Sequence, residues 1–126
     1  MPHKILVVDD DILVLDALRE LLFADGYEVM TATRGQQALE ILQQEHVDLV
    51  VLDVIMPKMT GFDVCRQIRA WEDEKGRVKI IMLTAKTDPR DQEIGEGAGC
   101  DLYLTKPIDP LKLKELIHST LGDLPR

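Results

Sequence analysis

The stretch Leu49-Val50-Val51-Leu52-Asp53 is a short apolar run that ends on a carboxylate. The run Ile5-Leu6-Val7-Val8 likewise ends on the pair Asp9-Asp10, and Ile80-Ile81-Met82-Leu83 ends on Thr84. Near-continuous apolar runs of this length are typical of strands that are buried on both faces of a parallel sheet. A packed core would not select acids at these ends, so the pattern indicates chemistry as well as fold.

Strand-like runs alternate with helix-like stretches along the chain. Strands are expected near 4–9, 27–32, 48–53, 79–84 and 101–105, and helices near 11–24, 35–45, 61–74, 89–97 and 110–121. Five such βα units are too few for a closed barrel, so we expect an open, doubly wound α/β sheet with helices on both faces. We find no repeat or linker in the sequence, which predicts a single domain over residues 1–126, with 122–126 leaving the last helix.

Several residues predict where the helices begin and which face they bury. Asp88-Pro89 and Asp109-Pro110 each place an N-cap carboxylate before a proline, and Thr60 with Asp63 resembles a capping box. The core-facing stripe of the first helix is expected to be Val14, Leu18, Leu21 and Leu22. The fourth helix contains Gly95, Gly97 and then Gly99, which could be its C-terminal cap. These glycines indicate either a soft helix or close packing, and both readings stay open.

Composition narrows the function further. Hydrophobic residues make up 45% of the 126 positions and charged residues 30%, as in ordinary globular proteins. The net charge of −8 argues against direct binding to nucleic acid. No apolar stretch is long enough to span a membrane and no signal peptide is evident, so we expect a cytoplasmic protein. Cys65 and Cys100 lack metal-binding spacing and are expected to be free thiols.

The polar strand ends together predict a site. In an open α/β sheet, ligands bind beyond the carboxyl ends of the strands. Clustered carboxylates repel one another unless a cation is present, and their hard oxygens suit Mg²⁺. Lys106 follows the fifth strand and can bind a phosphoryl oxygen, as can the hydroxyl of Thr84. A carboxylate beside the metal can attack phosphorus and form an aspartyl phosphate. A terminal Asp10 or Asp11 could instead be only the N-cap of the first helix.

The chain resembles the receiver domain of two-component response regulators over essentially its whole length. The resemblance is carried by Lys4–Asp10, Asp53–Gly61, Leu83-Thr84-Ala85 and Tyr103–Pro107. It implies a flavodoxin-like fold with five helices and strand order 2-1-3-4-5. It also implies a domain that accepts a phosphoryl group from a histidine kinase or a histidine phosphotransfer protein. Such a domain passes the signal to an effector and catalyses only its own phosphorylation and autodephosphorylation.

The resemblance assigns each site residue a role. Asp53 would be the phosphoacceptor, and Thr84 and Lys106 would hold phosphoryl oxygens. Mg²⁺, for which Mn²⁺ could substitute, would be bound by Asp10, Asp53 and the backbone carbonyl of Ile55, with Asp9 acting mostly through water. Thr84 and Tyr103 would form the switch, with Tyr103 swinging inward. The peptide bond between Lys106 and Pro107 would be cis.

The sequence also departs from the family pattern. In the family, the positions of Ile55 and Lys86 flank the line along which water attacks the aspartyl phosphate. The aliphatic Ile55 cannot position water and the cation of Lys86 could shield the phosphoryl oxygens, so we expect a long-lived phosphorylated state. The usual output face is the fourth helix, fifth strand and fifth helix. In winged-helix transcription factors of this family, charged residues on this face form ion pairs across a dimer. Asp101-Leu102 and Glu96 leave that set of ion pairs incomplete here, so we expect a monomer or a weak, phosphorylation-dependent dimer.

An apolar surface is expected beside the acidic site. Ile12–Leu15 is more apolar than one helix face requires, so Leu13 or Leu15 should be exposed. Together with Pro107 and Ile108, this apolar surface could dock a kinase or a phosphotransfer helix. Scattered surface leucines are the alternative. Trp71 should lie late in the third helix, away from the site.

Two other functions are weighed. Haloacid-dehalogenase-like phosphatases also combine Asp, Thr or Ser, Lys and Mg²⁺, but their nucleophile follows the first strand in an Asp-x-Asp pattern, whereas Asp9 and Asp10 are adjacent. An interaction module that signals without phosphate is the second alternative. The kinase, the signal, the output and any sequence beyond Arg126 are not determined by these residues.

Overall fold

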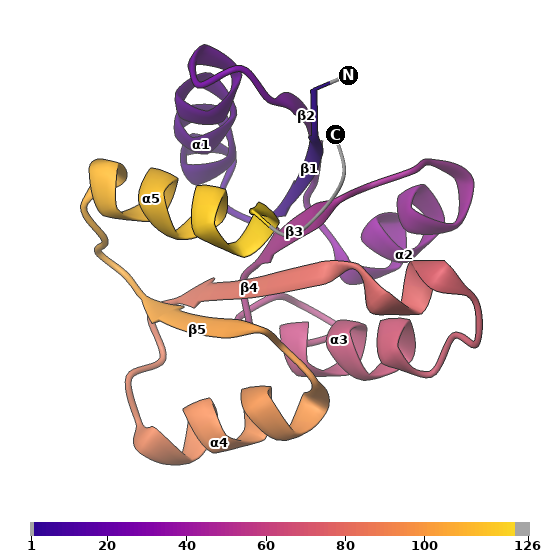
Figure 1. Ribbon diagram of the computed structural model, residues 1–126. Helices are drawn as coiled ribbons and strands as arrows, with labels where there is room; N and C mark the ends of the chain where they lie inside the picture. The colour runs from indigo at the N-terminus through magenta and orange to yellow at the C-terminus, as the bar shows by residue number, and fades with distance from the viewer. Residues whose placement is uncertain (1, 123–126) are drawn as a thin grey trace.

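The computed structural model describes residues 2–122 and shows a five-stranded parallel sheet covered by helices on both faces (Figure 1). The predicted exit of residues 123–126 from the last helix lies outside this range. The strand order β2-β1-β3-β4-β5 confirms the expected topology. The strands are β1 (Lys4–Val8), β2 (Glu28–Ala32), β3 (Leu49–Leu52), β4 (Lys79–Thr84) and β5 (Leu102–Thr105). The helices are α1 (Ile12–Ala24), α2 (Gly35–Gln44), α3 (Gly61–Arg69), α4 (Pro89–Ala98) and α5 (Pro110–Leu121), with a 3₁₀ turn, η1 (Glu74–Arg77).

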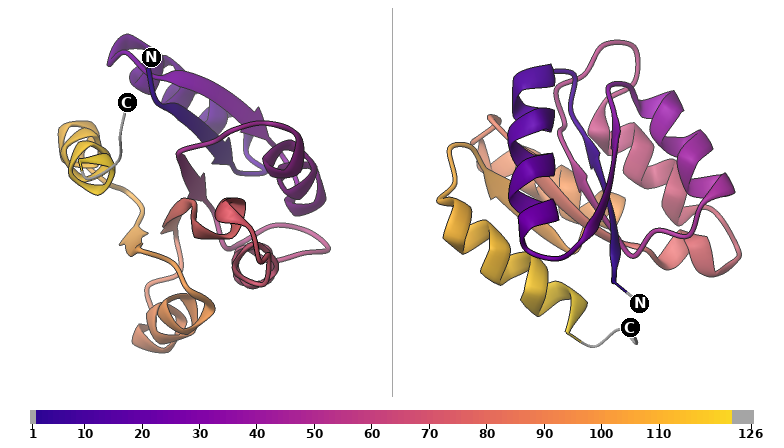
Figure 2. Two further views of the ribbon diagram at one scale, coloured as in Figure 1. Left: turned by 45° about the vertical axis from the view of Figure 1, so that its right-hand side comes forward. Right: turned by 90° about the horizontal axis from the view of Figure 1, so that it is seen from above.

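The sheet separates two hydrophobic cores because its side chains alternate between faces. α1 and α5 cover one face, while α2, α3 and α4 cover the other (Figure 2). The central strands β1 and β3 are buried from end to end, apart from the partly buried Lys4 at the start of β1. Burial on both faces is the physical reason that their sequences are continuously apolar instead of alternating.

Local capping explains where most helices begin. Thr60 and Asp63 form the predicted capping box at α3. The side chains of Asp88 and Asp109 cap α4 and α5, each before a proline in the first turn. Gly99 ends α4 in the left-handed conformation with φ +108°, as expected of a C-terminal glycine.

Two local predictions are corrected and a third is confirmed. α3 ends at Arg69 instead of near residue 74, so Trp71 lies after the helix, where the chain turns back into η1. In α1, Leu15 and Leu22 are buried, whereas Val14 is only partly buried. The prediction that Leu13 or Leu15 is exposed is confirmed by Leu13, which is 79% exposed, whereas Leu15 is 4% exposed. The patch therefore consists of Leu13 and Ile12, without Leu15.

Arg69 joins three separate parts of the chain at the end of α3. Its Nε donates to the carbonyl of Gly99 at 2.9 Å, and its Nη1 donates to the carbonyls of Gly76 at 2.9 Å and Val78 at 2.6 Å. Its Nη2 donates to Asp101 Oδ2 at 3.1 Å. One guanidinium therefore links α3 to the turns before β4 and before β5.

Both cysteines are free thiols, as predicted. Within residues 2–122, every helix is too short or too polar to cross a membrane.

Candidate functional site

Strand register brings the predicted acids together at the carboxyl edge of the sheet. Val8 of β1 pairs with Leu52 of β3, so the residues that follow them, Asp9 and Asp53, lie side by side. The backbone N–H of Asp53 donates to the carbonyl of Val8 at 2.9 Å and holds the end of β3 against β1. One carboxylate oxygen from each of Asp9, Asp10 and Asp53 lies within 4.8 Å of the others. The three acids thus form the predicted cluster.

The first turn of α1 determines what each acid of the triplet 9–11 can do. The side chain of Asp11 accepts the N–H of Leu13 at 2.9 Å, so Asp11 is the N-cap. The backbone N–H of Asp11 donates to Asp9 Oδ1 at 2.9 Å and orients that carboxylate. Asp10 is exposed and belongs to the acidic cluster. The alternative that Asp10 is only a cap is therefore wrong, and the cap is Asp11.

Lys106 lies between the two buried acids. Its Nζ donates to Asp9 Oδ2 at 2.7 Å and to Asp53 Oδ2 at 3.2 Å. Its backbone N–H donates to the carbonyl of Thr84 at 2.8 Å, which positions it beyond β5. The Lys106-Pro107 peptide bond is cis, as the resemblance implied. The lysine therefore serves as a cation for two carboxylates from different strands.

Charge and burial oppose each other in this cluster. Burial raises the pKa of Asp9, and the nearby charge of Asp53 adds to this effect, while the hydrogen bonds from Lys106 and Asp11 oppose it. Burial would lower the pKa of Lys106, but its hydrogen bonds to the two acids and their charges raise it above its usual value. The ammonium therefore stays charged but does not fully compensate Asp9. The site retains an excess of buried negative charge that a cation would relieve.

Thr84 and Ile55 complete the neighbourhood of Asp53. Thr84 is fully buried at the end of β4, and its Oγ1 accepts the N–H of Lys86 at 3.4 Å. The N–H of Ile55 donates to Asp53 Oδ1 at 3.1 Å, and the Ile55 side chain is 48% exposed. The backbone of Ile55 is thus beside Asp53, where the resemblance requires it, while its carbonyl as a metal ligand stays a prediction.

Sequence reasoning assigned no role to Gly61, although the structure gives it one. A Cβ at Gly61 would lie 2.3 Å from the carbonyl oxygen of Asp53 and 2.8 Å from Cα of Val54. The start of α3 therefore packs directly on the backbone that carries Asp53, which only glycine permits. The glycine after Thr60, at the beginning of a helix, is the signal in the sequence that could have identified this contact.

The predicted switch residue Tyr103 is half-buried on β5. Its hydroxyl donates to the carbonyl of Lys86 at 2.9 Å, and Lys86 Nζ lies 3.8 Å from Asp91 Oδ1 of α4. Tyr103 is therefore connected to Thr84 through Lys86. The predicted swing of the ring stays a prediction.

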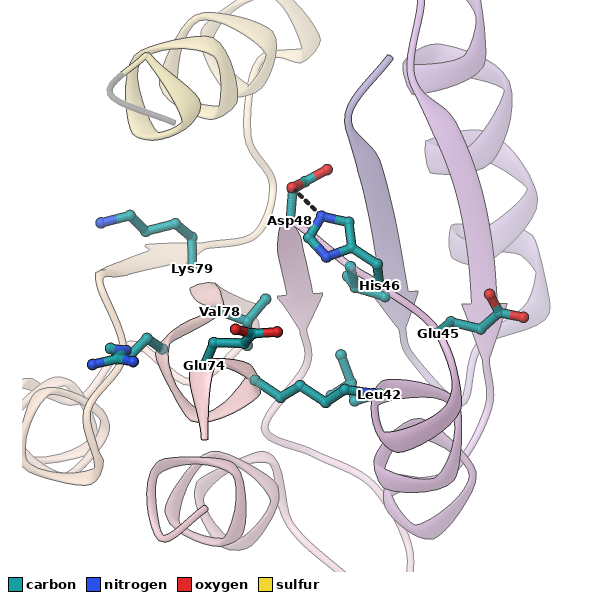
Figure 3. Close-up of a pocket in the computed structure, with 10 residues that line it drawn as sticks. Leu42, Glu45, His46, Asp48, Glu74, Val78 and Lys79 are labelled. Carbon is teal, nitrogen blue, oxygen red and sulfur yellow. Dashed lines mark hydrogen bonds and ion pairs between the residues drawn. The ribbon is translucent and has the colours of Figure 1, made fainter. Parts of the chain in front are cut away.

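A cavity of about 410 Å³ lies at the opposite end of β3 and β4, between the α2–β3 connection and η1 (Figure 3). Its apolar lining comes from Leu42, Val47 and Val78, and His46 at its rim contacts Asp48 at 2.8 Å. The cavity contains none of the predicted site residues, so it is separate from the acidic cluster.

Comparison with known proteins agrees with this geometry. The family model of the response regulator receiver domain matches residues 5–118. The probable transcriptional regulator ycf27 of Cyanophora paradoxa is 48% identical over 118 residues, which cover 94% of this chain and 48% of that protein. The chain thus spans about half the length of the curated relatives it matches.

Solved structures extend the comparison. The chemotaxis protein CheY4 of Vibrio cholerae has a TM-score of 0.89 and 34% identity, covering 96% of this chain and all (100%) of that one. The receiver domain of the sensor histidine kinase PA1611 of Pseudomonas aeruginosa has a TM-score of 0.87 and 31% identity, covering 98% and 100% of the two chains. That protein has a magnesium ion coordinated in its active site cleft. Together with the matched family model, these similarities show that the chain belongs to the response regulator receiver domain family of two-component signalling.

Proposed function

We propose that Asp53 accepts a phosphoryl group from a phosphohistidine of a histidine kinase or a histidine phosphotransfer protein. The observation that carries this proposal is the convergence of Asp9, Asp10, Asp53 and Lys106 at one edge of the sheet. The modified domain then shifts the population of its output face, formed by α4, β5 and α5, toward an active arrangement.

The donor set fits a hard divalent cation. The cluster offers carboxylate oxygens from three residues, and the raised pKa of Asp9 indicates buried negative charge that is not fully compensated. Asp10, Asp53 and the Ile55 carbonyl would hold Mg²⁺ or Mn²⁺, with Asp9 acting through water. When bound, the cation would neutralise charge on the phosphoryl oxygens.

The protein groups then have distinct tasks. A carboxylate oxygen of Asp53 forms a bond to phosphorus while the bond from phosphorus to the imidazole nitrogen of the donor breaks, and the electron pair leaves with the imidazole. Lys106 already contacts Asp53, so its ammonium is placed to bind an oxygen of the transferred group. Thr84 would exchange its bond with Lys86 N–H for one that its hydroxyl donates to another oxygen.

This function makes the chain a cytoplasmic signalling domain that turns over no external substrate. An effector that receives its signal would lie in a separate segment or protein, and the curated relative from Cyanophora is a probable transcriptional regulator. Family membership and the adjacent Asp9 and Asp10 leave no support for the phosphatase alternative. For the module that signals without phosphate, the discriminating variant is Asp53→Ala: its failure to alter any partner contact would favour that module over the proposal.

Labelling with acetyl phosphate and Mg²⁺, followed by intact-mass measurement, tests the proposal. We expect one added phosphoryl group in the wild type and none in Asp53→Asn. Lys106→Ala should slow labelling about 10²-fold, because it removes a preorganised charge from the transferred group. Glu40→Gln, a change of an exposed acid on α2 outside the cluster, is the control and should label normally. Labelling of Asp53→Asn at the wild-type rate would contradict the assignment.

A further inference from the structure

Gly95 lies on the buried face of α4, against the ring of Tyr103. A Cβ at this position would be 2.9 Å from Cδ2 and 3.3 Å from Cε2 of Tyr103, and 3.0 Å from Sδ of Met82. Met82 and Tyr103 are paired neighbours on β4 and β5, so their side chains share one face of the sheet. The helix therefore sits directly on these two side chains, at a distance that no side chain at residue 95 would allow.

The two neighbours differ in their freedom to move. Met82 is fully buried in the core between β4 and the helices. Tyr103 is half-buried on β5, which is an edge strand, and its inner side packs against the core that contains Met82. A side chain added at residue 95 would therefore displace the tyrosine ring, and the open direction is toward solvent.

The ring position is connected to the acidic site. Its hydroxyl bonds to the Lys86 carbonyl, while the N–H of the same residue bonds to the Thr84 hydroxyl. Lys86 Nζ approaches Asp91 of α4, so the helix, the ring and the loop after β4 are held by one residue. Displacement of the ring would remove one of these contacts and loosen the loop that adjoins Thr84.

We propose that the absence of a side chain at Gly95 leaves the space that the Tyr103 ring occupies, which we call the seat of Tyr103. A side chain at residue 95 biases the tyrosine outward, toward solvent. Gly97 supports a specific role for residue 95, because a Cβ at Gly97 would meet no atom within 4 Å. The two glycines share one helix, but only Gly95 is required by packing. The consequence for signalling rests on the proposed phosphorylation of Asp53, whereas the seat itself does not.

Gly95→Ala and its matched control Gly97→Ala test the proposal in the unphosphorylated protein. Nuclear Overhauser contacts between the Tyr103 ring and the Met82 methyl group should be lost in Gly95→Ala and retained in Gly97→Ala. Both substitutions remove the intrinsic penalty of glycine in a helix. The midpoint of urea unfolding should therefore rise in Gly97→Ala and should be lower in Gly95→Ala than in Gly97→Ala.

The same pair in a Tyr103→Ala background completes the experiment. Without the ring, the deficit of Gly95→Ala relative to Gly97→Ala should shrink to what the contact with Met82 alone costs. This comparison remains available if Gly95→Ala alone folds poorly. Retention of the ring contacts in Gly95→Ala, or an undiminished difference between the two alanine variants in the Tyr103→Ala background, would overturn the seat. A wild type that acetyl phosphate fails to label would instead overturn the proposed function and leave the seat unaffected.

Discussion

Replacing Arg69 with alanine should destabilise the domain by an amount that follows from its contacts. Three bonds to backbone carbonyls and one to Asp101 would be lost. The Arg69 side chain is 23% exposed, so water can reach part of this site and replace part of each bond. We therefore take about 1 kcal/mol for each carbonyl bond, the value for an ordinary net hydrogen bond, although its charge could give more. The partly exposed ion pair adds at most about 1 kcal/mol.

The expected loss is thus about 3–4 kcal/mol, a large fraction of the roughly 5–15 kcal/mol that stabilises a typical domain. With a urea slope of about 2 kcal/mol/M, the unfolding midpoint should fall by about 1.5–2 M. Fluorescence of Trp71, the single tryptophan, provides the assay because it follows α3 and packs against the core. Arg69→Lys should recover only a small part of the loss, since an ammonium cannot reach all three carbonyls.

Arg66→Ala is the matched control. Arg66 lies on the same helix, its side chain is 54% exposed, and it makes one ion pair, to Asp63 at 3.5 Å. Its removal should change the free energy of unfolding by less than about 0.5 kcal/mol. If Arg69→Ala lost less than about 1 kcal/mol, or no more than Arg66→Ala, the view of Arg69 as a link between three segments would be refuted.

Three further predictions concern the acidic site and its surroundings. Burial raises the folded pKa of Asp9, so the folded state binds this proton more tightly than the unfolded state does, and stability falls as pH rises through the interval between the two pKa values. Asp9→Asn should therefore make the metal-free domain more stable at pH 7 and flatten this part of the pH dependence in urea titrations; an unchanged profile would contradict the role of burial. Ile55→Asn and Lys86→Glu should each speed hydrolysis of the phosphorylated domain, measured by loss of label, because Asn can position the attacking water and Glu removes a cation that would shield the phosphoryl oxygens; equal rates in wild type and variants would reject a long-lived state. Leu13→Ala should slow phosphotransfer from a phosphohistidine partner but not labelling by acetyl phosphate, since Leu13 is exposed beside the acids, and similar slowing of both reactions would reject docking there.

The fold was predictable because its determinants are local and consistent. Continuous apolar strands require burial on both faces, and the capping residues Thr60, Asp88 and Asp109 mark where helices begin. The convergence of Asp9 and Asp53 followed from the parallel sheet, because the ends of neighbouring parallel strands share an edge. The roles within the site came from the resemblance to receiver domains and not from this geometry.

The errors arose where local sequence offers more than one solution. In Ile12–Leu15 every residue is apolar, so periodicity does not fix the phase of the helix, and Leu15 instead of Val14 is the more deeply buried. Beyond the end of α3 the chain folds back tightly, since a Cβ at Gly76 would lie 2.4 Å from the Trp71 carbonyl, and the helical pattern up to residue 74 does not reveal this turn. The bonds of Arg69 join residues distant in sequence, and no pattern in the sequence indicates them.

The bond between Lys106 and Asp9 spans 97 positions of the chain, and this has a consequence during synthesis. The acids emerge early and the lysine late, so a growing chain presents the acids long before their permanent cation exists. A partly made domain would therefore lack the group that we expect to bind the transferred phosphoryl. The sequence separation of this single ion pair would then prevent an incomplete chain from accepting a phosphoryl group. The chain becomes competent to receive its signal only after its last strand has been made.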